Sequence, residues 1–189
     1  MEKTTQKITT NRVFIYWSYV PELWSKMIVY ITGGQTPDYS DRWSHMGIAF
    51  ELSNGTVEAY EALFSYGFNG PEPMENINKK VHDKKGKLEL IDANIKNIYL
   101  ESIYDLCKSW VGKRGYNKFQ LILMWYYERF GRWFGWKIPT SPGKLVCSEA
   151  VARLVYPHID LRDVIRKNFD EINPNSAWRK WWLIRQQRI

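Results

Sequence analysis

Apolar and polar residues alternate most strictly between residues 45 and 52. One face would carry Met46, Ile48, Phe50 and Leu52, and the other would carry His45, Gly47, Ala49 and Glu51. A period of two predicts a strand that buries one face. Residues 53–55 read Ser-Asn-Gly, and a glycine suits the left-handed position that ends a three-residue hairpin loop. The second strand of this hairpin is therefore expected over residues 56–63.

Other segments predict a mixture of strands and helices. Residues 87–91 suit a further strand, and an apolar segment at 13–19 precedes a helix expected from Pro21 to about Ile31, closed by Gly33-Gly34. Helical spacing covers residues 98–111 and 118–130. A last helix opens at Cys147 and stops at Pro157, and Asn173-Pro174 marks a turn. Because strands and helices do not alternate regularly, the pattern predicts an α+β domain with an antiparallel sheet.

The composition is that of one soluble globular domain. The chain has 189 residues, of which 44% are hydrophobic and 25% charged, so a single domain over residues 1–189 is expected, with a Trp/Arg-rich tail from about residue 175. No apolar run reaches membrane-spanning length and none follows the polar N-terminus, so we expect no signal peptide and no transmembrane segment. A cytoplasmic protein, or a phage or virion component, is the expectation.

The net charge of +7 raises the question of an anionic partner. Lysines cluster within residues 76–90, a segment that we interpret as a solvated loop. Arginines are interleaved with tryptophans in residues 125–136 and 177–189, which suggests core packing, a membrane-surface contact or a protein contact. No RNA-recognition, zinc-finger or helix-turn-helix pattern accompanies the charge, so a nucleic-acid partner is not favoured.

Two cysteines occur, and they differ in position. Cys147 stands at the start of a predicted helix, where the helix dipole and free N–H groups favour a thiolate. Cys107 lies in the middle of a predicted helix without a polar neighbour, so we interpret it as structural. Neither cysteine has metal-ligand spacing or a disulfide framework around it, so free thiols are expected.

A cysteine nucleophile needs an imidazole to accept its proton. His82 lies in the lysine-rich segment and His158 at a helix end, so neither is obviously held in place. His45 begins the predicted strand, and its same-face neighbours Gly47 and Ala49 are small. We therefore expect room for the end of a helix above this face.

Three glutamates could orient the His45 imidazole. The three-residue loop pairs Gly47 with Glu61, which places Glu61 on the His45 face and diagonally adjacent. Glu58 then points to the opposite face, and Glu51 is about 20 Å along the strand. A two-residue loop would shift the register and bring Glu58 to the face, but far from the histidine. The register favours Glu61.

Residues 43–50 (WSHMGIAF), the Glu-Ala pairs after the hairpin and residues 145–151 (LVCSEAV) together resemble the permuted NlpC-like papain-fold cysteine hydrolases of the YiiX type. In that family the histidine strand precedes the cysteine helix, the reverse of the papain order. The resemblance spans roughly residues 44–151, with looser matches at Gly115-Tyr116 and residues 172–174. The chain lacks the usual Gly-Asp near residues 13–19, and its Glu-Ala pair occurs twice, which leaves Glu58 beside Glu61 as the third residue.

The resemblance implies a papain-like α+β fold with Cys147 as nucleophile, His45 as general base and later acid, and Glu61 as the residue that orients the imidazole. The Cys147 backbone N–H and one further donor would hold the oxyanion. Tyr116 would be a wall of the site, a hydrogen-bond donor or simply structural. No cofactor is implied, and the sequence contains no metal-ligand set and no phosphate-binding glycine loop.

Three functions remain open on this basis. The first is a cysteine peptidase or amidase that cleaves an amide bond, in peptide or cell-wall peptide, through a thioacyl-enzyme. The second is an acyltransferase or lipid hydrolase of the lecithin retinol acyltransferase type, which an aromatic helix over residues 119–136 at a membrane surface would suit. The third is an inactive binding or assembly module that docks through the Trp-rich C-terminus.

Overall fold

A five-stranded antiparallel sheet organises the protein. The computed structural model describes residues 9–32, 42–126, 144–158 and 174–175. The strands are β1 (Thr10–Tyr19), β2 (His45–Leu52), β3 (Val57–Leu63), β4 (Gly67–Pro73) and β5 (Lys87–Asp92), in the order β4-β3-β2-β1-β5. Together with the helices this is an α+β architecture, as the sequence predicts.

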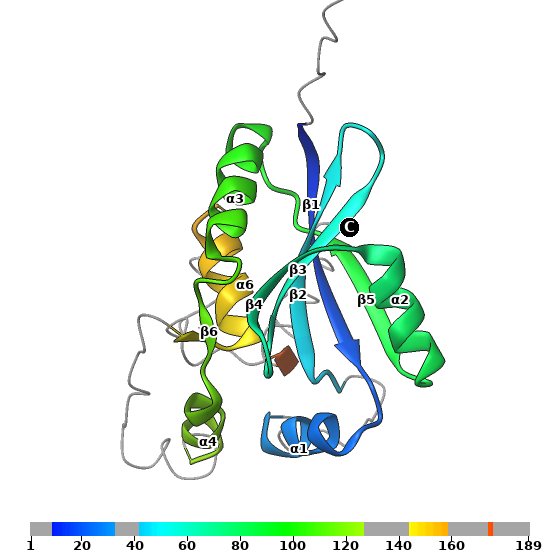
Figure 1. Cartoon of the computed structure of the whole chain (residues 1–189), viewed down its shortest axis with the longest axis vertical. Helices are drawn as coiled ribbons and strands as arrows, with labels where there is room; N and C mark the ends of the chain where they lie inside the picture. The colour runs from blue at the N-terminus through cyan, green and yellow to red at the C-terminus, as the bar shows by residue number, and fades with distance from the viewer. Residues whose placement is uncertain (1–8, 33–41, 127–143, 159–173, 176–189) are drawn as a thin grey trace, which may run out of the picture.

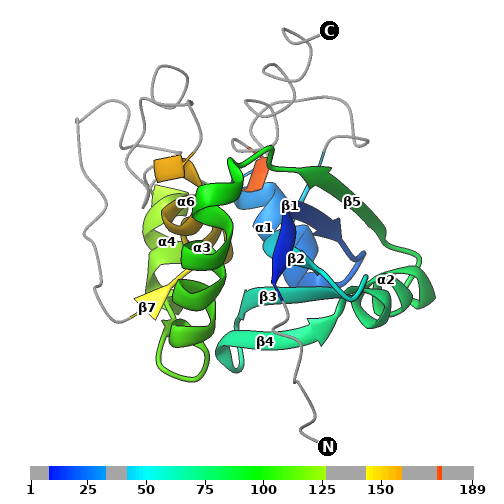
Figure 2. The same cartoon turned by 90° about the horizontal axis from the view of Figure 1, so that it is seen from above.

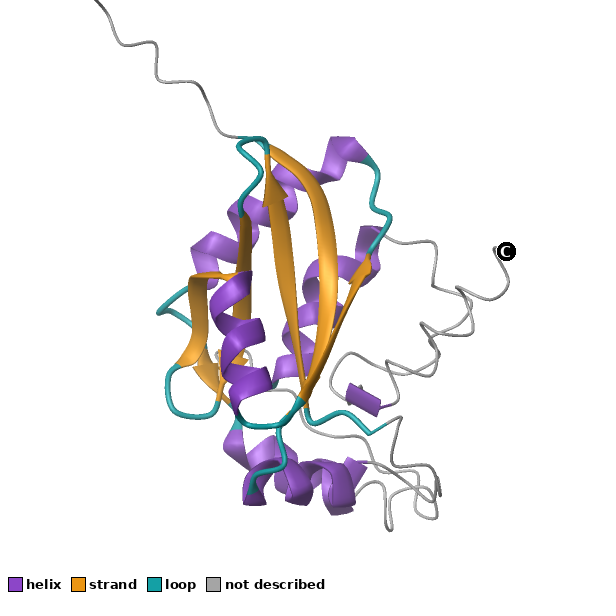
Figure 3. Ribbon diagram, turned by 90° about the vertical axis from the view of Figure 1, so that its right-hand side faces the viewer, coloured by secondary structure: helices purple, strands orange, loops and turns teal. Residues whose placement is uncertain are grey.

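The helices cover both faces of the sheet and one of its ends. They are α1 (Leu23–Thr32), α2 (Met74–Asp83), α3 (Asn97–Trp110), α4 (Lys118–Tyr126), α6 (Cys147–Val155) and the 3₁₀ turn η3 (Tyr156–His158). Figures 1 and 2 show α3 and α6 on one side of the sheet and α2 on the other. Figures 1 and 3 show α1 and α4 at the end of the sheet where β2 begins. A short parallel pair, β6 (Gly115–Tyr116) and β7 (Lys144–Leu145), leads into α6.

The two faces of the sheet have separate cores. Met46, Ile48 and Phe50 of β2 pack with the buried side of α3 and almost all of α6. On the other face Ala49 packs with a smaller cluster that includes Tyr16 of β1 and residues of α2. Alternation along β2 therefore sorts its side chains as a period of two requires, although residues on both faces are buried.

The predicted hairpin register is confirmed. Leu52 donates its N–H to the carbonyl of Thr56 at 2.8 Å, and Gly55 adopts the left-handed conformation with φ +82°. Gly47 pairs with Glu61, and Phe50 pairs with Glu58. The two glutamates therefore face opposite sides of the sheet.

The prediction of a solvated loop over residues 76–90 is wrong. The segment contains most of α2, a turn and the start of β5. Met74, Ile77 and Val81 lie on one side of α2 and are buried against the sheet, while Lys79, Lys80, Lys84 and Lys85 are exposed. Three apolar residues at helical spacing were enough to form the helix, because the sheet supplies the surface that buries them.

Other element boundaries differ from the predictions by a few residues. Pro21 precedes α1 instead of lying in its first turn, β1 extends the apolar segment back to Thr10, and Pro157 lies within η3. The strand β4 was not predicted.

The side chain of Asn175 is held by both backbone groups of Trp43. It accepts a hydrogen bond from the N–H at 2.7 Å and donates one to the carbonyl at 2.9 Å.

Some predicted features lie outside the described residues: the helix end at Gly33-Gly34, residues 127–136, Asn173 and the tail beyond residue 175. Among the described helices, none combines the length and the apolar character needed to cross a bilayer.

Candidate active site

His45 and Glu61 meet across the β2–β3 hairpin. The register places them diagonally on one face, and Nε2 of His45 lies 2.7 Å from Oε2 of Glu61. Both side chains are largely shielded from solvent, with 21% and 13% of their surfaces exposed. A short contact in a shielded place fixes the orientation of the ring and favours its protonated form.

Tyr16 is a member of this group that the sequence reasoning missed. Its hydroxyl donates to the same Oε2 of Glu61 at 2.7 Å, and the side chain is fully buried. Gly47 makes room for it, because a Cβ at that position would lie 2.2 Å from Cζ of Tyr16. The expectation that Gly47 and Ala49 leave room for a helix end is therefore wrong. The phenol ring fills that space, and the body of α6 packs on the opposite face.

Cys147 is the first residue of α6. The preceding Val146 is extended, with φ −93° and ψ 162°, so the chain turns into the helix directly at the cysteine. Glu149 is fully buried at the third helical position, where Oε2 lies 3.5 Å from the Val146 nitrogen and Oε1 accepts from Nε of Arg153 at 2.8 Å. A carboxylate in the first turn satisfies a free N–H and anchors the segment that presents the thiol.

The sulfur of Cys147 is surrounded by groups that stabilise a thiolate. Burial alone would raise its pKa, but the charge and the hydrogen bond of His45, together with the N–H groups of Met46 and Ser148, lower the pKa below the ordinary thiol value. Because Nε2 of the imidazole is engaged by Glu61, the other ring nitrogen is left for the thiol. The His45 ring thus lies between the carboxylate of Glu61 and the sulfur of Cys147.

His45 has the complementary shift. Burial opposes its charged form, yet the neighbouring Cys147 and Glu61 overcome that penalty and raise the pKa of the imidazole to about 10. Glu61 behaves accordingly. Burial would raise its pKa, but the hydrogen bonds from His45 and Tyr16 lower it. The group therefore favours a thiolate, an imidazolium and a carboxylate in series.

Tyr116 borders the sulfur from β6. Burial, the nearby Cys147 and a hydrogen bond with it raise the pKa of Tyr116 well above the ordinary phenol value, so the hydroxyl stays protonated and can donate. Its ring lies 5.7 Å from that of Phe64. The short parallel pairing of β6 with β7, just before α6, holds this tyrosine beside the helix mouth. Its place fits both the wall and the donor roles expected for it.

The remaining sequence candidates lie elsewhere. Cys107 is fully buried in the α3 core, where burial raises its pKa well above the ordinary value. Glu51 pairs with Arg12 at 3.6 Å near the far end of β2. His82 is exposed on α2, and the ring of His158 lies 4.9 Å from that of Tyr99. Glu58 faces α3 and accepts from the hydroxyls of Tyr60 and Tyr104.

Within the described part of the chain, His, Cys, Asp and Glu side chains form no group of three suited to holding a metal ion.

Comparison of the chain with protein-family models, with curated proteins and with solved structures finds no match. The case for a function therefore rests on the geometry and chemistry of the residues around Cys147.

Proposed function

We propose that the protein is a cysteine hydrolase of the peptidase or amidase kind, with the permuted papain-like arrangement that the sequence resembles. The observation that carries the proposal is the linear order of Cys147, His45 and Glu61, with the pKa of the thiol lowered and that of the imidazole raised. A buried thiolate–imidazolium pair is what nucleophilic cysteine catalysis requires.

The reaction would proceed in two steps. The Cys147 thiolate attacks the carbonyl carbon of an amide and forms the carbon–sulfur bond, and the carbonyl electrons move to oxygen. When the carbon–nitrogen bond breaks, the His45 imidazolium gives its proton to the leaving amine. The neutral imidazole then takes a proton from water, whose oxygen attacks the thioester and releases the acid and the thiolate. Glu61 keeps the ring oriented throughout.

The backbone N–H of Cys147, at the open end of α6, suits the developing oxyanion because the first helical N–H groups lack intrahelical partners. Tyr116 suits the second donor, since its hydroxyl is protonated and lies at the sulfur. The net charge of +7 suits substrates attached to an anionic polymer, such as cell-wall peptide.

A second candidate, acyl transfer to an acceptor other than water, shares the first step. It is favoured by the apolar surroundings of Tyr116: Phe64 is adjacent, and the ring of Trp24 lies 5.4 Å from Phe64. Both rings are exposed. Such a rim suits an acyl donor or acceptor with an apolar chain. The two candidates differ only in what receives the acyl group from Cys147.

Trapping the acyl-enzyme tests the proposal. The protein is incubated with p-nitrophenyl acetate and analysed by intact and peptide mass spectrometry. Wild type and Cys107→Ala should each gain one acetyl group at Cys147, whereas Cys147→Ala and His45→Ala should gain none there. Acetylation confined to lysines, or equal in all four proteins, would exclude a cysteine hydrolase and leave a binding or assembly module. Incubation with peptide and muropeptide amides then separates hydrolysis from transfer, because hydrolysis yields the free acid whereas transfer yields an acylated acceptor, and mass spectrometry of the products distinguishes the two.

A further inference from the structure

Two helices near the site have an unusual composition. α1 (LWSKMIVYIT) and α4 (KFQLILMWY) each contain a single charged residue, Lys26 and Lys118 respectively. A surface helix of a soluble protein normally has a charged or polar face opposite its buried stripe. These two helices lack such a face, although both lie at the periphery of the molecule and contact each other below the end of the sheet (Figure 1).

The apolar residues of these helices are exposed. Of the thirteen large hydrophobic side chains that are exposed among the described residues, nine lie on α1, on α4 or in the β3–β4 turn between them. We call them the α1–α4 surface: Leu23, Trp24, Met27, Tyr30, Phe64, Tyr66, Phe119, Ile122 and Tyr126. Tyr30 is 80% exposed and Leu23 is 76% exposed. A concentrated apolar surface of this kind marks a binding face, whereas single scattered residues do not.

This surface is continuous with the candidate active site. Tyr116 hydrogen-bonds to Cys147, its ring contacts that of Phe64, and Phe64 contacts Trp24 on α1. From the other side, Nζ of Lys118 lies 4.3 Å from the centre of the Phe64 ring. A path of aromatic rings thus leads from the sulfur to the exposed side of α1.

Within the described residues of α1 and α4, the only charged side chains are lysines. Lys26 and Lys118 are exposed on the two helices, and Lys113 and Lys144 are exposed at the ends of the segments that carry β6 and β7. The acidic residue next to α1, Glu22, already has an ion pair with Lys84 at 2.6 Å. Exposed Trp and Tyr side chains bordered by lysines, without acidic residues in either helix, match the headgroup region of an anionic bilayer.

We propose that the α1–α4 surface binds the interface of an anionic lipid membrane and holds the mouth of the Cys147 site against it. The aromatic and aliphatic side chains enter the boundary between headgroups and acyl chains, and the lysines contact anionic headgroups. The binding itself is independent of catalysis. Where the proposed function also holds, the substrate is an acyl compound presented at the membrane surface.

Flotation with vesicles tests the proposal. The full-length protein is mixed with vesicles of phosphatidylglycerol and phosphatidylcholine, or of phosphatidylcholine alone. The variant Trp24→Ser/Tyr30→Ser/Phe119→Ser removes three rings from the surface, and the matched control Ile98→Ser/Leu106→Ser removes two exposed apolar side chains from α3. We expect wild type and control to float with anionic vesicles. The surface variant should bind these vesicles at least about tenfold more weakly than wild type. Raising the salt concentration should weaken wild-type binding.

The result that would overturn the proposal is equal flotation of the surface variant and wild type, or no flotation of wild type. A wild-type protein that stays unbound but forms dimers that the surface variant does not form would show that a second copy covers the surface. Thermal unfolding checks that the variants are folded, which their exposed positions predict. Cys147→Ser should float like wild type, so failure of the hydrolase proposal is distinguishable from failure of membrane binding.

Discussion

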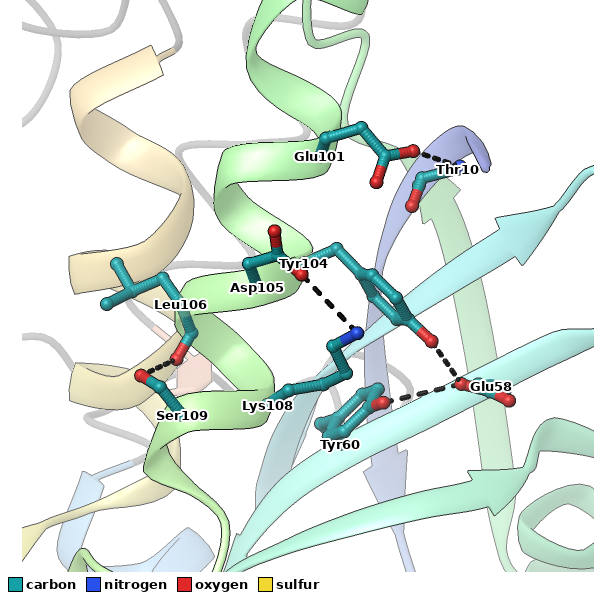
Figure 4. Close-up of polar contacts among 9 residues, drawn as sticks. All are labelled: Thr10, Glu58, Tyr60, Glu101, Tyr104, Asp105, Leu106, Lys108 and Ser109. Carbon is teal, nitrogen blue, oxygen red and sulfur yellow. Dashed lines mark hydrogen bonds and ion pairs between the residues drawn. The ribbon is translucent and has the colours of Figure 1, made fainter. Parts of the chain in front are cut away.

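Glu58 and Glu61 lie three residues apart on β3 and have similar local sequences, since an alanine follows each of them. Both carboxylates are partly buried, and both accept from tyrosine hydroxyls. Glu58 accepts from Tyr60 at 3.3 Å and from Tyr104 at 2.9 Å (Figure 4). Its partners are therefore groups that stay protonated at all ordinary pH values.

Glu61 has one such partner, Tyr16, and one titratable partner, His45. This difference decides what each carboxylate can do. A carboxylate held by two phenols can only brace the structure, whereas one held by a phenol and an imidazole sets the charge of the ring and, through it, that of Cys147.

The surroundings of Glu58 support a bracing role. Figure 4 shows Tyr104 reaching from α3 to Glu58, and Glu101 of the same helix accepting from the N–H of Thr10 at 2.6 Å. Lys108 lies over the Tyr104 ring, 4.3 Å from its centre. These contacts join α3 to β1 and β3. One strand thus supports a structural carboxylate on one face and a candidate catalytic one on the other.

The largest effect is expected from the two cysteines. Cys147→Ser should lower acyl-enzyme formation on the order of 10⁴-fold or more, because a serine hydroxyl is not ionised by this imidazole. Cys107→Ala should leave the rate unchanged and lower the free energy of unfolding by about 1 kcal/mol, as for the loss of one buried heavy atom. Burst kinetics with p-nitrophenyl acetate and urea titration measure the two effects. Equal losses of rate in both variants would remove the distinction.

The next effect separates the two glutamates. Glu61→Gln should slow acylation by about 100-fold or more, because the amide cannot stabilise an imidazolium. Glu58→Gln should leave acylation unchanged and reduce the free energy of unfolding by about 1 kcal/mol. The same kinetic and unfolding assays apply. If Glu58→Gln were the slower enzyme, the assignment of Glu61 would be wrong and Glu58, in the first Glu-Ala pair, would take its place.

A smaller effect is expected from the two tyrosines that donate to these carboxylates. Tyr16→Phe removes a hydrogen bond that lowers the pKa of Glu61, so the acid limb of the pH profile should move to higher pH and the acylation rate should fall about tenfold. Tyr104→Phe removes the equivalent hydrogen bond to Glu58 and should change neither the acid limb of the pH profile nor the acylation rate. An unshifted acid limb in Tyr16→Phe would mean that the tyrosine only fills space.

The smallest effect concerns stability and pH. The folded-state pKa of His45 is raised to about 10, so its contribution to stability is fully present below the ordinary imidazole pKa and is lost as the pH rises through about 10. The difference in urea midpoint between wild type and His45→Gln should therefore shrink towards zero as the pH rises towards about 10. A difference that stays constant from neutral pH to about pH 10.5 would contradict a raised imidazole pKa.

The hairpin could be predicted from sequence in detail because its information is local. Strict alternation identifies the faces of β2, the Ser-Asn-Gly loop sets the register, and the register places Glu61 and Glu58 on opposite sides. The position of Cys147 at a helix start was equally local, since the apolar residues Val151, Leu154 and Val155 that follow it have helical spacing.

Tyr16 could not be found in this way. It lies in β1, a strand with apolar residues on both faces, so alternation does not indicate which side the ring occupies. Its role depends on a distant glycine, Gly47, whose missing Cβ leaves the space that the phenol fills. β4 was hidden for another reason, because its sequence GFNGPEP contains glycines and prolines that are typical of turns.

The most direct test of the central claim is alkylation of the native protein by iodoacetamide across a range of pH, read peptide by peptide for Cys147 and Cys107, in wild type and in His45→Ala. We predict that Cys147 in wild type reacts at pH values well below the ordinary thiol pKa of about 8.5, that His45→Ala abolishes this reactivity, and that Cys107 stays protected in both. A Cys147 that titrates like an ordinary thiol, and does so equally in wild type and His45→Ala, would contradict the account.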